Sequence, residues 1–404
     1  MTQKRIRCSL LALALVGALP AAAADLVVWH AYRGGEKDAF EKVIAAYNAA
    51  NAAKGVKVST LAVPYDAFAD KITAAVPRGK GPDVFIYAQD RLGGWIEAGN
   101  TIEPIDFFLD KATTERFIPS TMEAMTYRGT VYGLPLNFKV LTQIYNKKLV
   151  SAPPKTGKEL VALAKKVGDP ATGRFGLAYQ YADFYYHAAL MNAFGGGVFK
   201  DGNQPVVNQA ANVKSLDFLV DWIDRDKILP LEPSTALITS LFNSGKAAIV
   251  FSGPWFLGEI APGVDWGLAP LPTIEAAGGQ PMRPWMTVEG VYVAAPSKNK
   301  DAAYDLAKYL TDLESARVLA LEGRQTPANR KVYDDAKVAA DQVLKAFRTQ
   351  VEVAVPMPNV PEMTMVWSPA TTAMNLIGKK SSTPKEALDQ AQKEVEERIS
   401  KLRK

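Results

Sequence analysis

The stretch of sequence that decides the fold is GPDVFIYAQDRLGGW, residues 81–95. Residues 84–87 form a short apolar run of β-prone side chains after Gly-Pro, which predicts a buried strand. The polar pair Asp90-Arg91 follows this strand. Because ligands of open α/β sheets bind outside the carboxyl ends of the strands, these groups predict part of a binding site. An Asp-Arg pair that only caps the next helix is the alternative interpretation.

Strands and helices alternate around this stretch. Apolar, β-prone residues at 26–29 and 56–63 predict strands, and helical spacing of apolar residues predicts helices at 36–51 and around 68–76. This alternation is typical of a mostly parallel, doubly wound sheet. The extended run at 134–145 is too long for one ordinary strand. We therefore expect it to cross from one lobe to another.

The first 24 residues have the pattern of a secretory signal peptide. Three basic residues precede an apolar run at 10–19, and a row of alanines ends at Ala24. Without this segment the formal charge falls from +5 to +2, which argues against a strongly basic nucleic-acid binder. The only cysteine, Cys8, precedes the apolar run, so the mature chain is expected to carry neither a disulfide nor a lipid anchor. These features predict a periplasmic protein.

The remaining chain is long enough for two cores of ordinary size. Three further segments combine aromatic residues with chain breakers: FSGPW at 251–255, PWMTVEG at 284–290 and MPNVP at 357–361, which leads on to Trp367. Sugars have an apolar C–H face that stacks on aromatic rings and hydroxyls that need polar partners, so this mixture suits carbohydrate. Burial of the tryptophans in the lobe cores is the alternative.

Taken together, these segments resemble family 1 extracellular solute-binding proteins of sugar ABC transporters, and most closely the maltose/maltodextrin-binding proteins. The resemblance covers almost all of residues 25–404. It implies an α/β fold of two lobes, each a mostly parallel sheet flanked by helices, joined by a multi-segment hinge and closing on ligand. The matching runs, in the family's order, are GPDVFIYAQDRLGG, LPLNFKVLTQIYNKKLV, FNSGKAAIVFSGPW, SKNKDAAYDLAKYL and MPNVPEMTMVW.

The resemblance also suggests where the lobes begin and end. The first lobe is expected to comprise residues 25–137 and 290–336, and the second residues 141–285 and 343–404. The hinge is expected near residues 138–140, 286–289 and 337–342.

The family's binding residues can be carried over position by position. Asp90 and Arg91 are expected to bind sugar hydroxyls, and Tyr87 stands where the maltose binders have a tryptophan. Lys139 replaces a hinge glutamate that contacts the sugar, which exchanges an acceptor for a donor and leaves the exact sugar open. The expected sugar-binding residues are Tyr32, Arg33, Glu36, Tyr87, Asp90, Arg91, Lys139, Asp183, Tyr185, Trp255, Trp285, Glu289, Met357 and Trp367.

The implied function is capture of a maltose- or maltodextrin-like oligosaccharide in the periplasm and its delivery to an inner-membrane ABC permease. We expect a monomer that uses no cofactor, no metal and no nucleic acid; His30 and His187 are the only histidines, too few for a metal site without cysteine. The alternative is a secreted glycan-acting hydrolase in which Asp90, Asp183 and Glu289 act as catalytic carboxylates. Lys139 and Arg33 also leave room for an anionic ligand such as a glycerophosphodiester.

Overall fold

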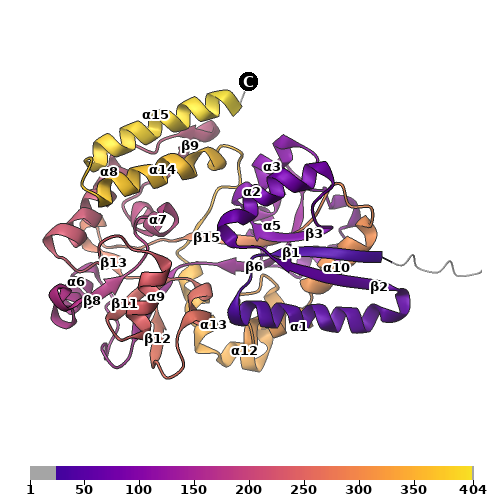
Figure 1. Cartoon of the computed structure of the whole chain (residues 1–404), viewed down its shortest axis with the longest axis horizontal. Helices are drawn as coiled ribbons and strands as arrows, with labels where there is room; N and C mark the ends of the chain where they lie inside the picture. The colour runs from indigo at the N-terminus through magenta and orange to yellow at the C-terminus, as the bar shows by residue number, and fades with distance from the viewer. Residues whose placement is uncertain (1–23, 403–404) are drawn as a thin grey trace, which may run out of the picture.

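The computed structural model describes residues 24–402. Two sheets lie side by side, each surrounded by helices, and extended segments of chain run between them (Figure 1). We call the first sheet with its helices the first lobe and the second sheet with its helices the second lobe. The signal peptide expected at residues 1–24 lies outside the described residues, except for Ala24, which begins the first strand.

The first sheet has six strands in the order β16-β15-β3-β1-β2, with β6 also paired to β15. Its strands are β1 (Ala24–His30), β2 (Val56–Ala62), β3 (Val84–Ala88), β6 (Gly133–Lys139), β15 (Trp285–Val293) and β16 (Val355–Pro356). The helices of this lobe are α1 (Gly34–Asn51), α2 (Tyr65–Ala75), α3 (Leu92–Ala98), α4 (Lys111–Glu115), α5 (Pro119–Ala124), α10 (Lys300–Leu310) and α11 (Leu313–Leu321).

The second sheet has four strands in the order β12-β7-β11-β8. They are β7 (Thr142–Asn146), β8 (Phe175–Ala178), β11 (Ala247–Ser252) and β12 (Trp266–Ala269). The helices around it are α6 (Gly157–Val167), α7 (Phe184–Ala193), α8 (Ala210–Val220), α9 (Thr235–Asn243), α14 (Met363–Gly378) and α15 (Pro384–Leu402), and the short helices α12 (Ala336–Ala340) and α13 (Gln342–Val351) lead into this lobe.

Three hairpin-like pairs of very short strands complete the set of described strands. They are β4 (Thr126–Tyr127) with β5 (Thr130–Val131), β9 (Phe199–Lys200) with β10 (Gln204–Pro205), and β13 (Thr273–Ile274) with β14 (Gln280–Pro281).

The two-lobed α/β fold is confirmed. Parallel pairs predominate in the first sheet, where β1 pairs parallel with β2 and β3 and β15 pairs parallel with β16, whereas among the described strands of the second sheet only β11 and β8 run parallel. Each sheet also contains antiparallel pairs. β15 runs antiparallel to β3, and β7 runs antiparallel to β11. The register explains why: Ala88 at the end of β3 pairs with Glu289, and Ser252 at the end of β11 pairs with Thr142. β3 and β11 therefore end at the junction between the lobes. β7 and β15 begin at that junction and run away from it, so β7 is antiparallel to β11 and β15 is antiparallel to β3.

The long extended run expected at 134–145 is two strands in different sheets. β6 ends at Lys139 in the first sheet and β7 begins at Thr142 in the second, with the buried residues Val140 and Leu141 between them. β15 returns the chain to the first sheet, where it pairs with both β6 and β3. The two crossing strands β6 and β15 thus lie side by side at the junction.

Apolar spacing in the sequence places the cores. On α1, Phe40 and Ile44 lie on the buried face that the helical periodicity predicts, and they pack against Val28 of β1 and Val84 of β3. The second lobe has its own core, which includes the almost fully buried Trp222. A further cluster of buried apolar residues, which includes Phe85 of β3 and Val250 of β11, runs across the junction, so apolar packing also joins the two lobes.

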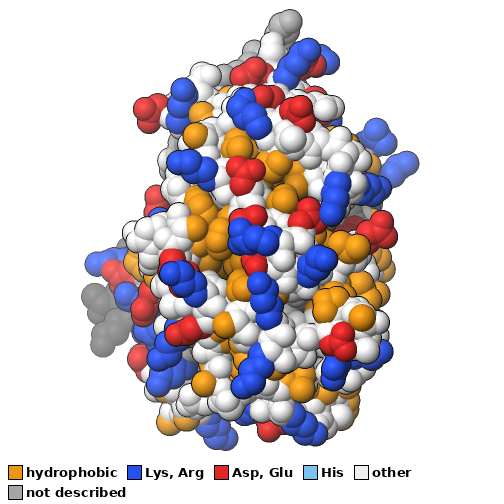
Figure 2. Space-filling model, turned by 90° about the vertical axis from the view of Figure 1, so that its left-hand side faces the viewer, with side chains coloured by type: hydrophobic (Ala, Val, Ile, Leu, Met, Phe, Trp, Pro, Cys, Tyr) orange, Lys and Arg blue, Asp and Glu red, His pale blue; other side chains and the backbone are white. Residues whose placement is uncertain are grey.

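The described surface carries mixed charge. Basic and acidic side chains are interspersed over the face drawn in Figure 2, as expected for a chain whose formal charge is close to balance. None of the helices within residues 24–402 combines the length and the apolar composition of a membrane span. In the same range, no group of three His, Cys, Asp or Glu residues is arranged to hold a metal ion.

Candidate functional site

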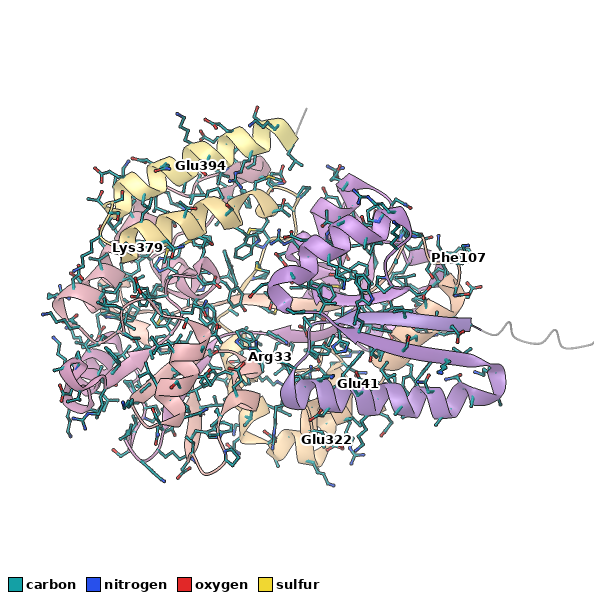
Figure 3. All side chains as sticks on the ribbon, viewed as in Figure 1. Arg33, Glu41, Phe107, Glu322, Lys379 and Glu394 are labelled. Carbon is teal, nitrogen blue, oxygen red and sulfur yellow. The ribbon has the colours of Figure 1, made fainter. Side chains whose placement is uncertain are left out.

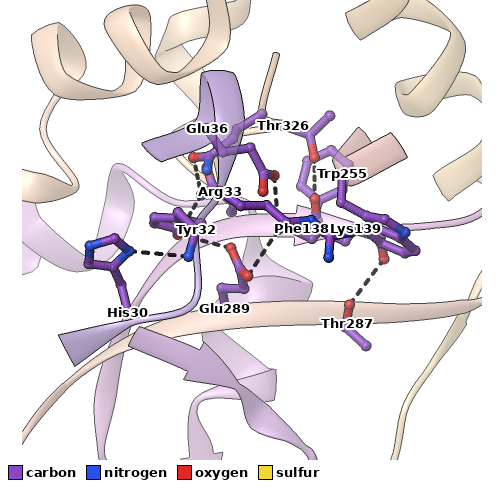
Figure 4. Close-up of polar contacts among 12 residues, drawn as sticks. His30, Tyr32, Arg33, Glu36, Phe138, Lys139, Trp255, Thr287, Glu289 and Thr326 are labelled. Carbon is purple, nitrogen blue, oxygen red and sulfur yellow. Dashed lines mark hydrogen bonds and ion pairs between the residues drawn. The ribbon is translucent and has the colours of Figure 1, made fainter. Parts of the chain in front are cut away.

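A buried cluster of three charged residues lies at the junction, where β6 and β15 pass the start of α1 (Figure 4). Lys139 Nζ lies 3.0 Å from Glu36 Oε1 and 3.0 Å from Glu289 Oε1, and each of the three side chains is only about one-tenth exposed. Burial lowers the pKa of Lys139, but the carboxylates of Glu289 and Glu36 outweigh this effect and raise it above its usual value. Lys139 is therefore charged and doubly paired.

Neutral side chains complete this cluster. The Tyr32 hydroxyl donates to Glu289 Oε2 at 3.0 Å, and Asn137 Nδ2 donates to the Tyr32 oxygen at 3.3 Å and to Gln325 Oε1 at 2.6 Å. Lys139 Nζ also lies 5.4 Å from the ring centre of Tyr32 and 6.0 Å from that of Trp255, within the range of a cation–π attraction. The cluster thus links the first lobe to a tryptophan of the second.

A second polar group joins the two lobes directly. Trp367 of α14 donates from Nε1 to Asp90 Oδ2 at 3.1 Å, and Arg91 Nε lies 3.2 Å from the same oxygen. Asp90 follows β3 in the short helix η3 (Gln89–Arg91) and is 4% exposed. Burial raises its pKa to about 6, although Arg91 and Trp367 act in the opposite direction. Its Oδ1 is buried without a hydrogen-bond partner among the described residues, so it can accept a hydroxyl.

The second lobe contributes a wall of aromatic rings. Trp255 follows β11 in the short helix η8 (Pro254–Glu259) and donates from Nε1 to the Tyr186 hydroxyl at 3.2 Å. Its ring centre is 6.1 Å from that of Tyr185, and the centres of Trp285 and Trp367 are 5.7 Å apart at 80°. Trp255, Tyr185 and Trp367 are partly exposed. Rings in this state can stack on a sugar at little entropic cost.

Three more of the expected residues, like Tyr32 and Asp90, are deeply buried. Trp285 is 2% exposed and packs against Phe184, with ring centres 5.4 Å apart. Met357 is 4% exposed, and its carbonyl accepts from Gln89 Nε2 at 3.1 Å. Tyr87 is 5% exposed and belongs to the core of the first lobe. These side chains support the site and offer little surface to a ligand.

The remaining expected residues have polar partners at the junction. Arg33 Nη2 lies 2.6 Å from Glu259 Oε1, so an ion pair joins the start of α1 to the second lobe, and Figure 3 places Arg33 between the lobes. Asp183 caps α7 by accepting from the Tyr185 backbone N–H at 2.9 Å. Burial raises the pKa of Asp183, although the hydrogen bond from Tyr185 acts to lower it.

Residues that sequence reasoning did not select also belong to this junction: Asn137, Gln325 and Tyr186. Asn137 lies in the middle of the crossing run, a position that already indicated a role at the junction. Tyr186 follows Tyr185 in a tyrosine-rich segment, which is the signal that could have found it. Nothing local to Gln325 distinguishes it, because its partner Asn137 lies 188 residues earlier in the chain.

Comparison with known proteins agrees with this architecture. Residues 33–316 match the family model of the bacterial extracellular solute-binding proteins. A maltotriose-binding protein of Pyrococcus abyssi is 33% identical over 359 residues, covering 87% of this chain and 77% of the relative. A maltooligosaccharide ABC transporter solute-binding lipoprotein of Streptococcus pneumoniae is 28% identical over 353 residues, covering 83% and 80%.

Solved structures give the same result at the level of the fold. The maltotriose-binding protein of Thermus thermophilus, bound with maltotriose, superposes with a TM-score of 0.84 at 28% identity, covering 93% of this chain and 100% of that one. The match spans both lobes, as does the alignment with the Pyrococcus relative. The chain therefore belongs to the bacterial extracellular solute-binding proteins.

Proposed function

We propose that this protein captures a maltooligosaccharide between its two lobes and delivers it to an ABC permease. The observation that carries the proposal is the 3.1 Å contact between Trp367 Nε1 and Asp90 Oδ2, because it joins a partly exposed ring of one lobe to a carboxylate of the other. Rings and hydroxyl acceptors at one place are what a pyranose needs. The sugars named for the matched relatives support the same ligand class.

Closure of the lobes follows from this arrangement. A ligand can drive closure only through its greater affinity for the closed arrangement, so it has to contact both lobes. Asp90 and Arg91 approach from the first lobe, and Trp255 and Trp367 from the second. We propose that the lobes move about the crossing segments expected near residues 138–140, 286–289 and 337–342.

The charges at the junction favour a neutral ligand. Lys139 is paired with Glu36 and Glu289, and Arg33 with Glu259. An anionic sugar would have to compete with these carboxylates for the cations, and it would meet their repulsion as well. We therefore set aside the anionic ligand considered from the sequence and propose a neutral oligosaccharide.

A hydrolase is less well supported. The three carboxylates considered for catalysis have separate structural partners: Glu289 binds Lys139, Asp90 binds Arg91, and Asp183 caps α7. The matched family is named for binding a solute. We propose a receptor that performs no chemistry on its ligand.

Location and partners follow the same reasoning. The family is extracellular, and the pneumococcal relative is named as part of an ABC transporter. The basic and apolar pattern of the first 24 residues suits export followed by cleavage. We propose a periplasmic monomer whose partner is the inner-membrane permease.

Isothermal titration of purified residues 25–404 with maltotriose tests the function. We expect micromolar affinity, about −8 kcal/mol, a reversible change in tryptophan fluorescence, and at least tenfold weaker binding for Trp255→Ala. Phe107→Ala is the matched control, because Phe107 is 94% exposed and lies on the far side of the first lobe (Figure 3). No response to maltotriose, maltotetraose or a galactosyl oligosaccharide would contradict the proposal, and shortened sugars in the mixture would indicate a hydrolase.

A further inference from the structure

The family resemblance makes Tyr87 an expected sugar-binding residue, yet its ring has little free surface. It lies 5.1 Å from the ring of Phe68 at 9° and 5.0 Å from the ring of Tyr65 at 22°, measured between centres. Trp95 packs on it as well, at 5.7 Å. With 5% of its surface exposed, Tyr87 is a packing residue in the first lobe.

Tyr65 is the exposed member of this group of rings. It is 51% exposed, whereas Phe68 is completely buried. It begins α2, three residues after Ala62, the last residue of β2. Ala62 pairs with His30 at the end of β1. Tyr65 therefore starts from the same edge of the sheet that carries Tyr32.

Electrostatic effects indicate that the first turn of α2 faces the junction. Half of the Tyr65 side chain is exposed, yet the surroundings of its hydroxyl are crowded: burial raises the pKa of this hydroxyl, and the neighbouring Tyr87 and Asp90 raise it further. The next residue, Asp66, adds to the raised pKa of Asp183 in the second lobe, after the larger effect of burial. In Figure 1, α2 lies on the side of the first lobe that faces α7 and α14.

We propose that Tyr65 supplies the aromatic face on which the first lobe holds one pyranose ring of the ligand, in the place that the family resemblance gave to Tyr87. This inference rests on the proposed function and adds a contact residue to it. Tyr65 is well suited because the buried rings of Tyr87 and Phe68 support it from behind. A tyrosine has two side-chain torsions, so little entropy is lost when a sugar stacks on it. Asp90 is close enough to raise the pKa of the Tyr65 hydroxyl, so one sugar ring can contact both residues.

Titration of maltotriose into a set of Tyr65 variants tests this role. Tyr65→Ala is expected to weaken binding about tenfold, which matches the upper range for one aromatic contact. Tyr65→Phe keeps the ring and is expected to stay within about threefold of the wild type. Tyr65→Leu keeps apolar volume without a flat ring and is expected to resemble the alanine variant. Phe107→Ala, the exposed aromatic control in the same lobe, is expected to bind as the wild type does.

The results separate this inference from the proposed function. If the wild type binds and Tyr65→Ala binds within twofold of it, Tyr65 does not hold the sugar and the inference is wrong. If Tyr65→Phe loses as much affinity as Tyr65→Ala, the hydroxyl and not the ring makes the contact, which also overturns it. If the wild type binds none of the sugars tested, the proposed function fails and the inference fails with it. A midpoint of thermal unfolding close to that of the wild type shows that a variant is folded.

Discussion

Replacing Lys139 by methionine removes the one cation that holds the buried cluster together. The change keeps the length and the apolar stem of the side chain but deletes the ammonium group that lies 3.0 Å from both Glu36 and Glu289. Two carboxylates then face each other with little access to water. We expect the folded protein to be markedly less stable at neutral and alkaline pH.

The size of the effect can be worked out from the geometry. At 3.0 Å and an effective dielectric constant of about 20, each pair gains about 5 kcal/mol of Coulomb energy. Desolvation of the ammonium offsets several kcal/mol of this gain. Removing one partner of a buried pair costs about 3–5 kcal/mol, because the remaining charge stays buried without compensation. We expect a loss in this range.

Protonation of Glu36 can relieve the strain in the variant. Burial already raises the pKa of Glu36 in the wild type against the effect of Lys139, and loss of Lys139 raises it further. A carboxyl whose pKa is higher in the folded state than in the unfolded state contributes its stability at low pH and loses it as pH rises through the folded value. The deficit of Lys139→Met should therefore be large at pH 8 and clearly smaller at pH 5.

Urea unfolding followed by circular dichroism at both pH values measures this deficit. Lys42→Met is the matched control: Lys42 pairs with Glu322 at 2.6 Å on the surface, with side chains 61% and 47% exposed, so its loss should cost less than about 1 kcal/mol. Adding Glu36→Gln to Lys139→Met should restore part of the stability. A Lys139→Met protein within 1 kcal/mol of the wild type at pH 8 would refute the reasoning.

Two further predictions concern the contacts between the lobes. Because the pKa of Asp90 is raised to about 6 and its ionised form is the better hydroxyl acceptor, maltotriose affinity should fall between pH 7.5 and pH 5. Titrations with maltotriose at both pH values should show a smaller change in affinity for Asp90→Asn than for the wild type. If the variant loses as much affinity between pH 7.5 and pH 5 as the wild type does, Asp90 is not the titrating group. Gly93→Ala should destabilise the protein by about 1–3 kcal/mol in urea unfolding, since its Cβ would meet the backbone of Asn359 and Pro361 at 2.7–2.8 Å. Gly94→Ala should cost less, because its Cβ would meet only the side chain of Thr364, at 3.0 Å.

Local sequence patterns predicted the elements of the fold well. The apolar face of α1 and the short strand β3 were found within two residues of their ends, because periodicity and chain breakers act over a few neighbouring residues. Strand direction was predicted less well. Whether β15 runs parallel or antiparallel to β3 depends on the side from which the chain enters the sheet, and no local pattern near residue 290 encodes that direction.

The candidate site shows the same limit at the level of single side chains. The pattern around Asp90 and Trp367 indicated polar and aromatic groups at a binding site, and the structure brings the two side chains into contact. It could not indicate that Tyr87 is covered by Phe68 and Tyr65. Burial of a ring depends on packing between separate elements, and no single stretch of sequence contains that information.

Lys139 shows why a binding residue cannot be transferred from a relative one position at a time. A glutamate at this position, next to Glu36 and Glu289, would place three carboxylates within a few ångströms, and one or more of them would have to take up a proton. The lysine instead forms an ion pair with each of the two glutamates. A carboxylate held by a single ammonium still has lone pairs for a sugar hydroxyl. We therefore propose that Glu36 of α1 and Glu289 of β15 accept sugar hydroxyls at this place, while Lys139 of β6 holds the two carboxylates.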